Sequence, residues 1–183
     1  RAPMELVQDG ESIIINGGTT TFAMVEFMAE RTLDVLTNSI PIVTALQTTR
    51  NRVLIPAGTV HPEQNIELCP YESDGIEHFW GQKLFTGCYG LNRFGMMEAD
   101  PVIVRAHEKL LKRSDELIVL AHSRKLRQRS PLIVARLDCI GTLITDDGAT
   151  EEELDVFRAA GVKVITVAVS AEQLAQPSSA GAR

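Results

Sequence analysis

Cysteine is scarce in this sequence, since Cys69, Cys88 and Cys139 are odd in number and far apart. Such a set favours reduced thiols over a disulfide framework, so we expect a cytoplasmic protein. No CxxC or HxxxH spacing indicates a metal centre, and we expect neither a metal nor another cofactor. The sequence also lacks a signal peptide and an apolar run long enough to span a bilayer, so we expect no membrane partner.

Several catalytic and nucleotide-binding patterns are missing as well. There is no GxSxG and no Cys/His pair at an informative spacing, which argues against nucleophilic catalysis. The patterns GxGxxG and GxxxxGKS/T are also absent, which argues against a dinucleotide fingerprint and a P-loop.

An excess of positive charge is also lacking, because the net charge is −6 and the pI is about 5.2. Nucleic-acid-binding modules usually carry a basic face or a pI above about 9. We therefore expect that this chain does not bind DNA by itself. Its 183 residues, 44% hydrophobic and 23% charged, suit one globular domain with a substantial core.

Strand and helix patterns, in contrast, alternate along most of the chain. Apolar runs predict strands over residues 12–16, 33–37, 52–55, 66–68, 83–86, 116–121, 133–136, 139–145 and 162–169. Helical spacing predicts helices over residues 19–30, 40–48, 101–113 and 150–160, and a loop over 87–100. This alternation predicts one α/β domain with at least six strands in a mostly parallel sheet.

The clearest functional feature is the turn after the first predicted strand. The run Ile13–Ile15 stops at Asn16, Gly17 and Gly18, and Thr19, Thr20 and Thr21 open the predicted helix. Glycines let the backbone approach a ligand closely, and the first N–H groups of a helix attract anions. The turn therefore fits a phosphate site, or equally a Thr-capped helix that binds nothing.

Polar residues follow the other predicted strands too, and the carboxyl ends of parallel strands lie on one edge of a sheet. We expect these residues to converge on one cleft that holds a polyhydroxylated anion. The candidates beyond the turn are Thr37, Asn38, Ser39, Gly58, Gly87, Asp100, His122, Ser123 and Lys125. Lys125 would neutralise the phosphate as a mobile point charge.

Several of these residues have simpler interpretations. Lys125 lies in a basic stretch that could be a solvated loop, and residues 37–39 could simply cap the next helix. The segment 146–148 is more typical of a turn than of a ligand site. We expect His107 and Glu108 to be surface or hydrogen-bonded polar residues of a helix rather than an acid/base pair.

A set of short motifs occurs in a fixed order: Asp9-Gly10, Asn16-Gly17-Gly18-Thr19-Thr20, Thr37-Asn38-Ser39, Pro56-Ala57-Gly58, Gly90-Leu91, Ser123-x-Lys125 and Leu143-Ile144-Thr145-Asp146. In this order the motifs resemble the C-terminal sensor domain of DeoR-type bacterial transcriptional regulators, over about Asp9 to Val167. Residues 15–22 and 83–87 look most similar to the branch that contains the repressor of L-ascorbate utilisation.

The resemblance implies a three-layer α/β/α fold of the sugar-phosphate isomerase and CoA transferase type. It implies an effector-binding domain over residues 9–170, a lead-in over 1–8 from an N-terminal helix-turn-helix domain, and a flexible tail over 171–183. It also implies three kinds of partner: a phosphorylated sugar or sugar acid as effector, operator DNA through the N-terminal domain, and other copies of the chain in a homo-oligomer.

Three residues depart from the family pattern. The family has Asp before Gly-Gly-Thr-Thr, where this chain has Asn16, and Asp before Ser-x-Lys, where it has His122. Its Gly-Gly after the third strand is Ala57-Gly58 here. The loss of two carboxylates should make the site less negative, and His122 adds a group that titrates near neutral pH.

The sequence thus predicts a sensor that is not an enzyme and has no catalytic residue. The alternative is a sugar-phosphate isomerase of the same fold, which would need a carboxylate base. Glu108 falls near the base of related isomerases, but the segment 87–90 lacks their carboxylates. A purely structural oligomerisation domain is a third possibility, although it would not need so many polar strand ends.

Overall fold

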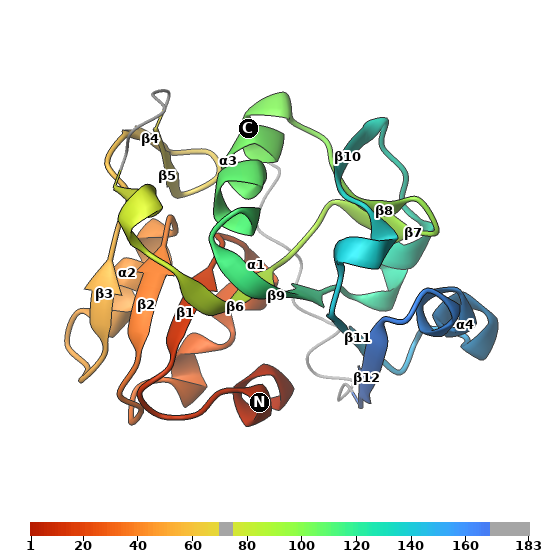
Figure 1. Ribbon diagram of the computed structural model, residues 1–183, viewed down its shortest axis with the longest axis horizontal. Helices are drawn as coiled ribbons and strands as arrows, with labels where there is room; N and C mark the ends of the chain where they lie inside the picture. Colours follow the sequence, from red (N-terminus) through yellow and green to blue (C-terminus); the bar gives the residue numbers. More distant parts are fainter. Residues whose placement is uncertain (70–74, 169–183) are drawn as a thin grey trace.

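A parallel sheet runs through the part of the chain that the structure describes, residues 1–69 and 75–168 of a computed structural model (Figure 1). Its seven strands, in spatial order, are β12 (Lys163–Val167), β11 (Thr142–Asp146), β9 (Ser114–Leu120), β6 (Gly81–Thr86), β1 (Ser12–Ile15), β2 (Asp34–Thr37) and β3 (Arg52–Leu54). All six neighbouring pairs are parallel. The chain runs outward from β1 to β3 and then returns to β6 on the other side of β1, so the strand order reverses between β1 and β6.

Strand β1 lies in the middle of this sheet and is buried on both faces. Ile14 belongs to the core on one face, whereas Ile13 and Ile15 belong to the core on the other. A continuous β-branched run is what a parallel strand covered on both sides requires.

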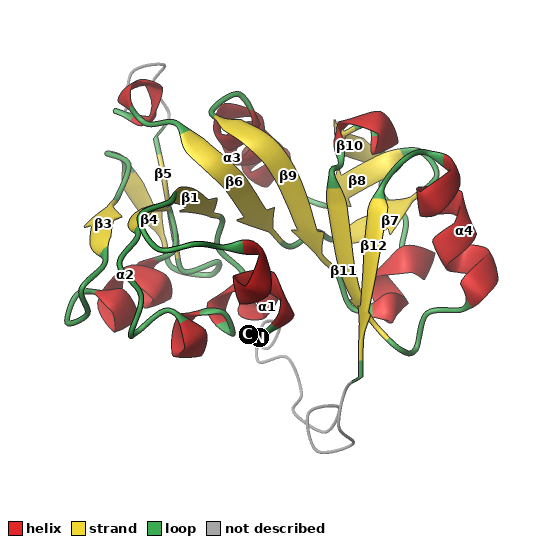
Figure 2. Cartoon of the chain, turned by 60° about the horizontal axis from the view of Figure 1, so that its bottom comes forward, coloured by secondary structure: helices red, strands yellow, loops and turns green. Residues whose placement is uncertain are grey.

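Helices cover both faces of the sheet, as Figure 2 shows. One face carries Met4, Met24, Met28, Ile42 and Leu46, which come from the N-terminal segment and the first two crossovers. The other face carries Leu110, Leu154 and Phe157 from the later helices. The α-helices are α1 (Thr19–Phe22), α2 (Ile40–Leu46), α3 (Pro101–Leu111) and α4 (Glu151–Ala159), and the 3-10 helices are η1 (Ala2–Leu6), η2 (Val25–Phe27), η3 (Ile76–His78), η4 (Ser123–Arg127) and η5 (Leu137–Cys139). The predicted three-layer α/β/α class is confirmed.

Two small antiparallel sheets are added at the edge of this sandwich. One is the hairpin of β4 (Thr59–His61) and β5 (Ile66–Leu68), and the other joins β7 (Gly90–Asn92), β8 (Gly95–Glu98) and β10 (Leu132–Ala135). The prediction of a loop over 87–100 is therefore wrong. Leu91 and Met96 are fully buried in the core, and Gly95 at φ 123° permits the tight turn that returns the chain.

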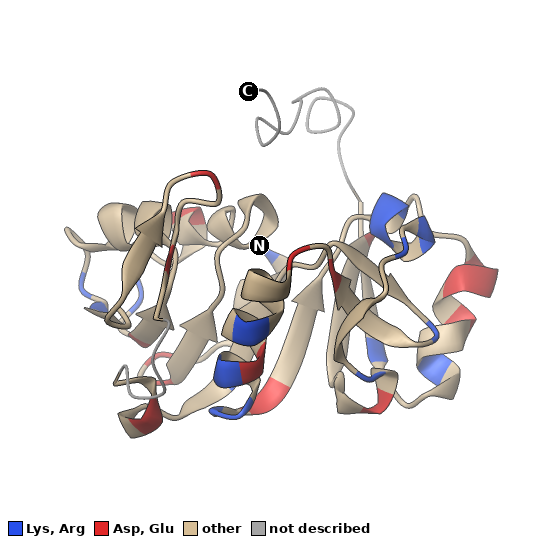
Figure 3. Ribbon diagram, turned by 90° about the horizontal axis from the view of Figure 1, so that it is seen from above, with Lys and Arg blue, Asp and Glu red and all other residues tan. Residues whose placement is uncertain are grey.

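The predicted strand 139–145 begins later than expected, at Thr142, because residues 137–139 form η5. Helix α4 begins with a capping box between Thr150 and Glu153, and Gly161 follows its end at φ 86°. Among the described residues, Lys and Arg positions are spread over several elements, as Asp and Glu positions are (Figure 3). The expected tail, 171–183, lies outside the described residues.

Candidate functional site

The predicted anion turn lies at the carboxyl end of β1, beside the reversal of strand order. Gly18, Thr19 and Thr20 are exposed to solvent, whereas Asn16 and Thr21 are buried. The Gly17 N–H donates to Asn16 Oδ1 and to Asn38 Oδ1, each at 2.9 Å. The turn is thus held by two side-chain amides, and its later residues face solvent.

The helix after this turn is much shorter than predicted. α1 ends at Phe22, and the chain continues as the 3-10 helix η2 instead of running to residue 30. Thr21 Oγ1 donates to the carbonyls of Asn16 and Gly18, and such side-chain bonds compete with regular helix formation. Because α1 has one turn, its dipole is small, and turn amides and hydroxyls are the groups available to an anion.

The three polar residues at the end of β2, Thr37 to Ser39, are all buried and hydrogen-bonded within the protein. Thr37 Oγ1 donates to the Ile15 carbonyl at 2.6 Å, which ties β2 to β1. Ser39 caps α2 by accepting from the Ile42 N–H at 3.4 Å. The expected capping role is therefore present, and Asn38 links this corner to the turn through Gly17.

A buried histidine from α3 lies beneath the anion turn. His107 is 2% exposed, and its Nε2 lies 2.6 Å from Asn16 Nδ2 and 2.7 Å from Thr86 Oγ1. Its Nδ1 lies 3.1 Å from the Ile103 carbonyl. Burial lowers the pKa of His107 to about 4, so the ring is neutral at pH 7. The interpretation of His107 as a hydrogen-bonded polar residue is confirmed, while Glu108 is exposed.

The segment after β6 gathers a second group of polar side chains. Lys125 Nζ lies 5.6 Å from the centre of the Tyr89 ring. The Glu98 carboxylate accepts from the Tyr89 N–H at 3.2 Å, and burial raises the pKa of Glu98 to about 7. Burial also raises the pKa of Cys88 to about 12, so its thiol is not a nucleophile at neutral pH. Gly87 links this group to the end of β6.

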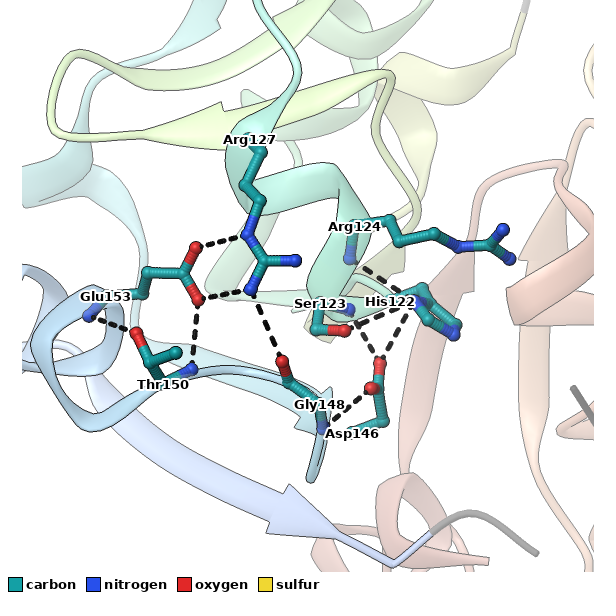
Figure 4. A network of polar contacts seen from close by, with 8 residues as sticks. All are labelled: His122, Ser123, Arg124, Arg127, Asp146, Gly148, Thr150 and Glu153. Carbon is teal, nitrogen blue, oxygen red and sulfur yellow. Dashed lines mark hydrogen bonds and ion pairs between the residues drawn. The ribbon is translucent and has the colours of Figure 1, made fainter. Parts of the chain in front are cut away.

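His122 and Ser123 meet the end of β11 in the network of Figure 4. The Ser123 N–H donates to Asp146 Oδ2 at 2.6 Å, and His122 Nδ1 lies 3.3 Å from the same oxygen. The Gly148 N–H donates to Asp146 Oδ1 at 3.0 Å. Burial disfavours ionisation of Asp146, but these hydrogen bonds and the nearby His122 outweigh it and lower the pKa of Asp146. His122 Nε2 has no hydrogen-bond partner among the described residues.

Two other predicted residues have clear structural roles. Asp100 caps α3, because its Oδ1 accepts from the Val102 N–H at 2.8 Å. A side chain at Gly58 would collide with the Leu68 carbonyl and the Glu67 carboxylate, so glycine lets the turn after β3 lie against the β4–β5 hairpin. The structure therefore separates the candidates into a group at β1 and β2, a group at β6, β9 and β11, and these two positions.

A cleft of about 550 Å³ opens beside the first group. It is lined by Asn38, by residues of the β4–β5 hairpin, and by residues of α3 that include Val102, Arg105 and Ala106. Its volume is within the range of small-molecule sites. Among residues 1–69 and 75–168, no three His, Cys, Asp or Glu side chains gather as they would around a metal ion. No helix of the same residues is long and apolar enough to cross a membrane.

Sequence reasoning missed three residues that hold the site together: His107, Glu98 and Asp146. His107 is buried together with Ala106 and Leu110 on the inner face of α3. Helical spacing alone does not show on which face of the helix His107 lies. The sequence predicts a loop around Glu98 and a turn at Asp146, and neither pattern indicates the contacts that these carboxylates make. Asp146 and Ser123 are 23 residues apart, and Asn16 and His107 are 91 apart.

Comparison with known proteins agrees with this architecture. The regulator "HTH-type transcriptional regulator UlaR" of Shigella dysenteriae serotype 1 is 32% identical over 168 residues, which are 91% of this chain and 66% of that protein. The chain thus spans about two-thirds of the length of the curated relatives it matches. Relatives of the same name occur in Escherichia coli and, at 31% identity, in Salmonella arizonae.

Solved structures are similar in fold at much lower identity. The eIF2B beta structure from Chaetomium thermophilum aligns at a TM-score of 0.50 and 12% identity, covering 76% of this chain and 44% of that one. A ribose 5-phosphate isomerase A from Methanocaldococcus jannaschii aligns at a TM-score of 0.48 and 12% identity, covering 68% and 50%.

The sequence model of one family, described as "DeoR C terminal sensor domain", matches residues 1–147, which is most of the chain. The match includes the turn after β1 and reaches the end of β11. This agrees with the motif order and with the regulators at 32% identity. The chain therefore belongs to the DeoR family, as a C-terminal sensor domain.

Proposed function

We propose that this sensor domain binds a phosphorylated sugar or sugar acid, with the phosphate at the turn formed by residues 17–21. One observation carries the proposal: exposed Gly18, Thr19 and Thr20 follow β1 at the point where the strand order reverses. In open α/β sheets, ligands bind in the crevice at this point. The exposed hydroxyls and turn amides are donors suited to an oxyanion.

The second group of polar residues supplies the remaining contacts in this proposal. Lys125 provides a positive charge near the end of β6, and His122 Nε2 has no partner among the described residues. The sugar hydroxyls then lie between the two groups, near Gly87. The 550 Å³ cleft beside Asn38 gives room for the part of the effector that extends away from the phosphate.

Effector binding regulates DNA binding in this proposal. The relatives are named as HTH-type regulators, and this chain spans 66% of their length. A helix-turn-helix domain elsewhere in the full-length protein would contact operator DNA, and copies of the chain would form a homo-oligomer in the cytoplasm. The effector acts by binding one arrangement of this assembly more tightly than another, and DNA must in turn change effector affinity by the same factor.

The isomerase alternative rests on a different carboxyl group from the one the sequence indicated. Glu108 is exposed on α3, whereas its neighbour His107 is buried. Glu98, whose pKa burial raises to about 7, is better matched to proton transfer near neutral pH. Glu98 is therefore the carboxyl group to test for the isomerase alternative. The matched relatives, in contrast, are named as transcriptional regulators.

Thermal-shift measurements with a panel of sugar phosphates, together with an isomerase assay, separate these functions. A sensor is stabilised by at least one phosphorylated sugar and converts none. Turnover that disappears in Glu98→Gln would favour the isomerase. If no phosphorylated sugar stabilises the protein, the result would favour a domain that serves only in oligomerisation.

Lys125→Ala gives a sharper test, with Arg124→Ala as the matched control because Arg124 is its exposed neighbour in η4. We expect Lys125→Ala to weaken binding of the phosphorylated ligand about tenfold or more, which corresponds to about 1.4 kcal/mol. Binding of the dephosphorylated analogue should change much less. Equal weakening of both ligands would mean that Lys125 does not meet the phosphate.

A further inference from the structure

The buried contact between α3 and the turn after β1 has a definite hydrogen-bond direction. Asn16 Oδ1 accepts from the Gly17 N–H at 2.9 Å, so the Asn16 Nδ2 group must face the other way. It faces His107 Nε2 at 2.6 Å and Thr86 Oγ1 at 3.2 Å. An NH2 group only donates, so His107 Nε2 has to accept.

This requirement selects one tautomer of the imidazole. If Nε2 accepts, the proton of the neutral ring is on Nδ1, and Nδ1 lies 3.1 Å from the Ile103 carbonyl, which accepts it. In the opposite tautomer Nε2–H would donate to Thr86 Oγ1, 2.7 Å away, but it would oppose the Asn16 NH2 group at 2.6 Å and leave an unprotonated Nδ1 facing a carbonyl oxygen. The state of His107 and the orientation of Asn16 are therefore mutually dependent.

The orientation of Asn16 matters for the turn. In this orientation Asn16 Oδ1 shares the Gly17 N–H with Asn38 Oδ1, and the two amide oxygens together hold the turn. Gly17 itself packs so closely beneath Ile66 that a side chain there would collide with it. The next residues, Gly18 to Thr20, are the exposed ones to which we assign the anion.

We propose that His107 is a positioning residue of the anion turn: as a neutral hydrogen-bond acceptor it fixes the Asn16 amide, which in turn holds Gly17 and presents the residues that follow. This inference rests on the proposed function only for the identity of the ligand. His107 does not itself contact the effector. Its role is to couple helix α3, whose Arg105 and Ala106 line the 550 Å³ cleft, to the turn at the end of β1.

The surroundings of the ring favour the neutral state. The groups that face it from β1, β6 and α3 are Asn16, Thr86 and the carbonyls of Gly87 and Ile103, all of them uncharged. On α3 itself, Glu108 is exposed and Arg105 lines the cleft. Burial accordingly lowers the pKa of His107 to about 4.

The first test replaces the donor that faces Nε2. In Asn16→Asp the carboxylate cannot donate and instead favours an imidazolium, so the pKa of His107 should rise by about one to three units. Nuclear magnetic resonance of the ring nitrogens in the 183-residue chain measures this, and should show the Nδ1–H tautomer in the unaltered protein from pH 8 to 5. Asn38→Asp is the matched control, because Asn38 also binds Gly17 but is not a partner of His107. An equal pKa in all three proteins, or the Nε2–H tautomer, would overturn the proposal.

The second test removes the acceptor. His107→Leu should speed hydrogen exchange of the Gly17 amide at least tenfold and weaken binding of inorganic phosphate, detected at the amides of Gly18 to Thr20. His107→Gln offers a side-chain oxygen to Asn16 and should restore much of both. If His107→Leu does not fold, two measurements test the proposal instead: the hydrogen exchange of Gly17 in His107→Gln and the pKa of His107 in Asn16→Asp. Unchanged exchange and phosphate affinity in His107→Leu would overturn the positioning role. If the unaltered protein binds no phosphate at Gly18 to Thr20, the proposed anion site is wrong. The hydrogen exchange of Gly17 and the pKa of His107 still test whether His107 positions Asn16.

Discussion

Asp146 offers the clearest test of the interactions that hold the second half of the site. Its carboxylate accepts from the Ser123 N–H at 2.6 Å and from the Gly148 N–H at 3.0 Å, and His122 Nδ1 lies 3.3 Å away (Figure 4). Asp146 is 6% exposed, so water replaces these bonds poorly. Asp146→Ala removes the acceptor for two main-chain donors at once.

The expected loss follows from those two bonds. Hydrogen bonds to charged groups contribute about 1.5 to 3 kcal/mol each, and a buried donor without an acceptor costs about 1 to 3 kcal/mol. Because Gly148 is exposed and can bind water instead, we expect a total loss of about 3 kcal/mol. For a domain of this size that lowers Tm by about 6 to 12 °C.

The pH dependence gives an independent check through Asp146→Asn, which keeps the shape and removes the charge. The pKa of Asp146 is lower in the folded protein than its ordinary value, so the ionised carboxylate stabilises the fold. This contribution is present above the unfolded pKa of about 3.9 and is lost as the pH falls through the folded value. The stability difference between the unaltered protein and Asp146→Asn should be full at pH 6 to 7 and should close below about pH 4.

Urea unfolding, followed by circular dichroism, measures both effects. Asp147→Ala is the matched control, since Asp147 is the exposed neighbour and should change stability by less than about 0.5 kcal/mol. If Asp146→Ala is as stable as Asp147→Ala, the carboxylate is not what holds Ser123 and His122, and the reasoning is refuted.

Three further changes test other parts of the structure by the same unfolding assay. Because burial raises the pKa of Glu98 to about 7, its stabilising contribution is present below about pH 4.3 and is lost as the pH rises through 7. Glu98→Gln should therefore be more stable than the unaltered protein by about 1 kcal/mol at pH 8 and equal to it near pH 4, and no difference at pH 8 would count against the burial of this carboxyl group. Thr150→Ala should cost about 1 kcal/mol by removing the capping box of α4, and a neutral result would mean that the cap is not formed. Gly58→Ala should cost about 2 kcal/mol because its side chain would meet the Leu68 carbonyl, whereas Gly18→Ala has room and should be nearly neutral; equal effects would contradict the packing at Gly58.

The strands of the main sheet were predictable because their signal is local. A run such as Ile13–Ile15 has one stable use, a strand buried on both faces, and the glycines after it end the strand. The cap at Thr150 has a local signal too, since it pairs with Glu153 three positions away. Asp100, in contrast, is an effector candidate in the sequence and caps α3 in the structure. The motif order also led to the DeoR family, which the family comparison confirms.

The short α1 and the β7–β8 hairpin could not be predicted from local sequence signals. In α1, helical spacing suggested a long helix, but the Thr21 hydroxyl bonds back to the turn and the chain continues as η2. In the hairpin, strands of three and four residues carry too little pattern to stand out, and pairing of β8 with the distant β10 stabilises them. Both outcomes depend on contacts that sequence spacing does not contain.

The sequence by itself determined the parallel α/β class, the polar turn at the end of β1 and the family, because each depends on residues close together or on their order. Only the tertiary structure decided which polar groups are engaged inside the protein and which face solvent. It turned Asn16 toward His107 and Ser123 toward Asp146, across separations of 91 and 23 residues. The physical reason is that a buried polar group needs a partner at hydrogen-bond distance, and the fold alone brings that partner there.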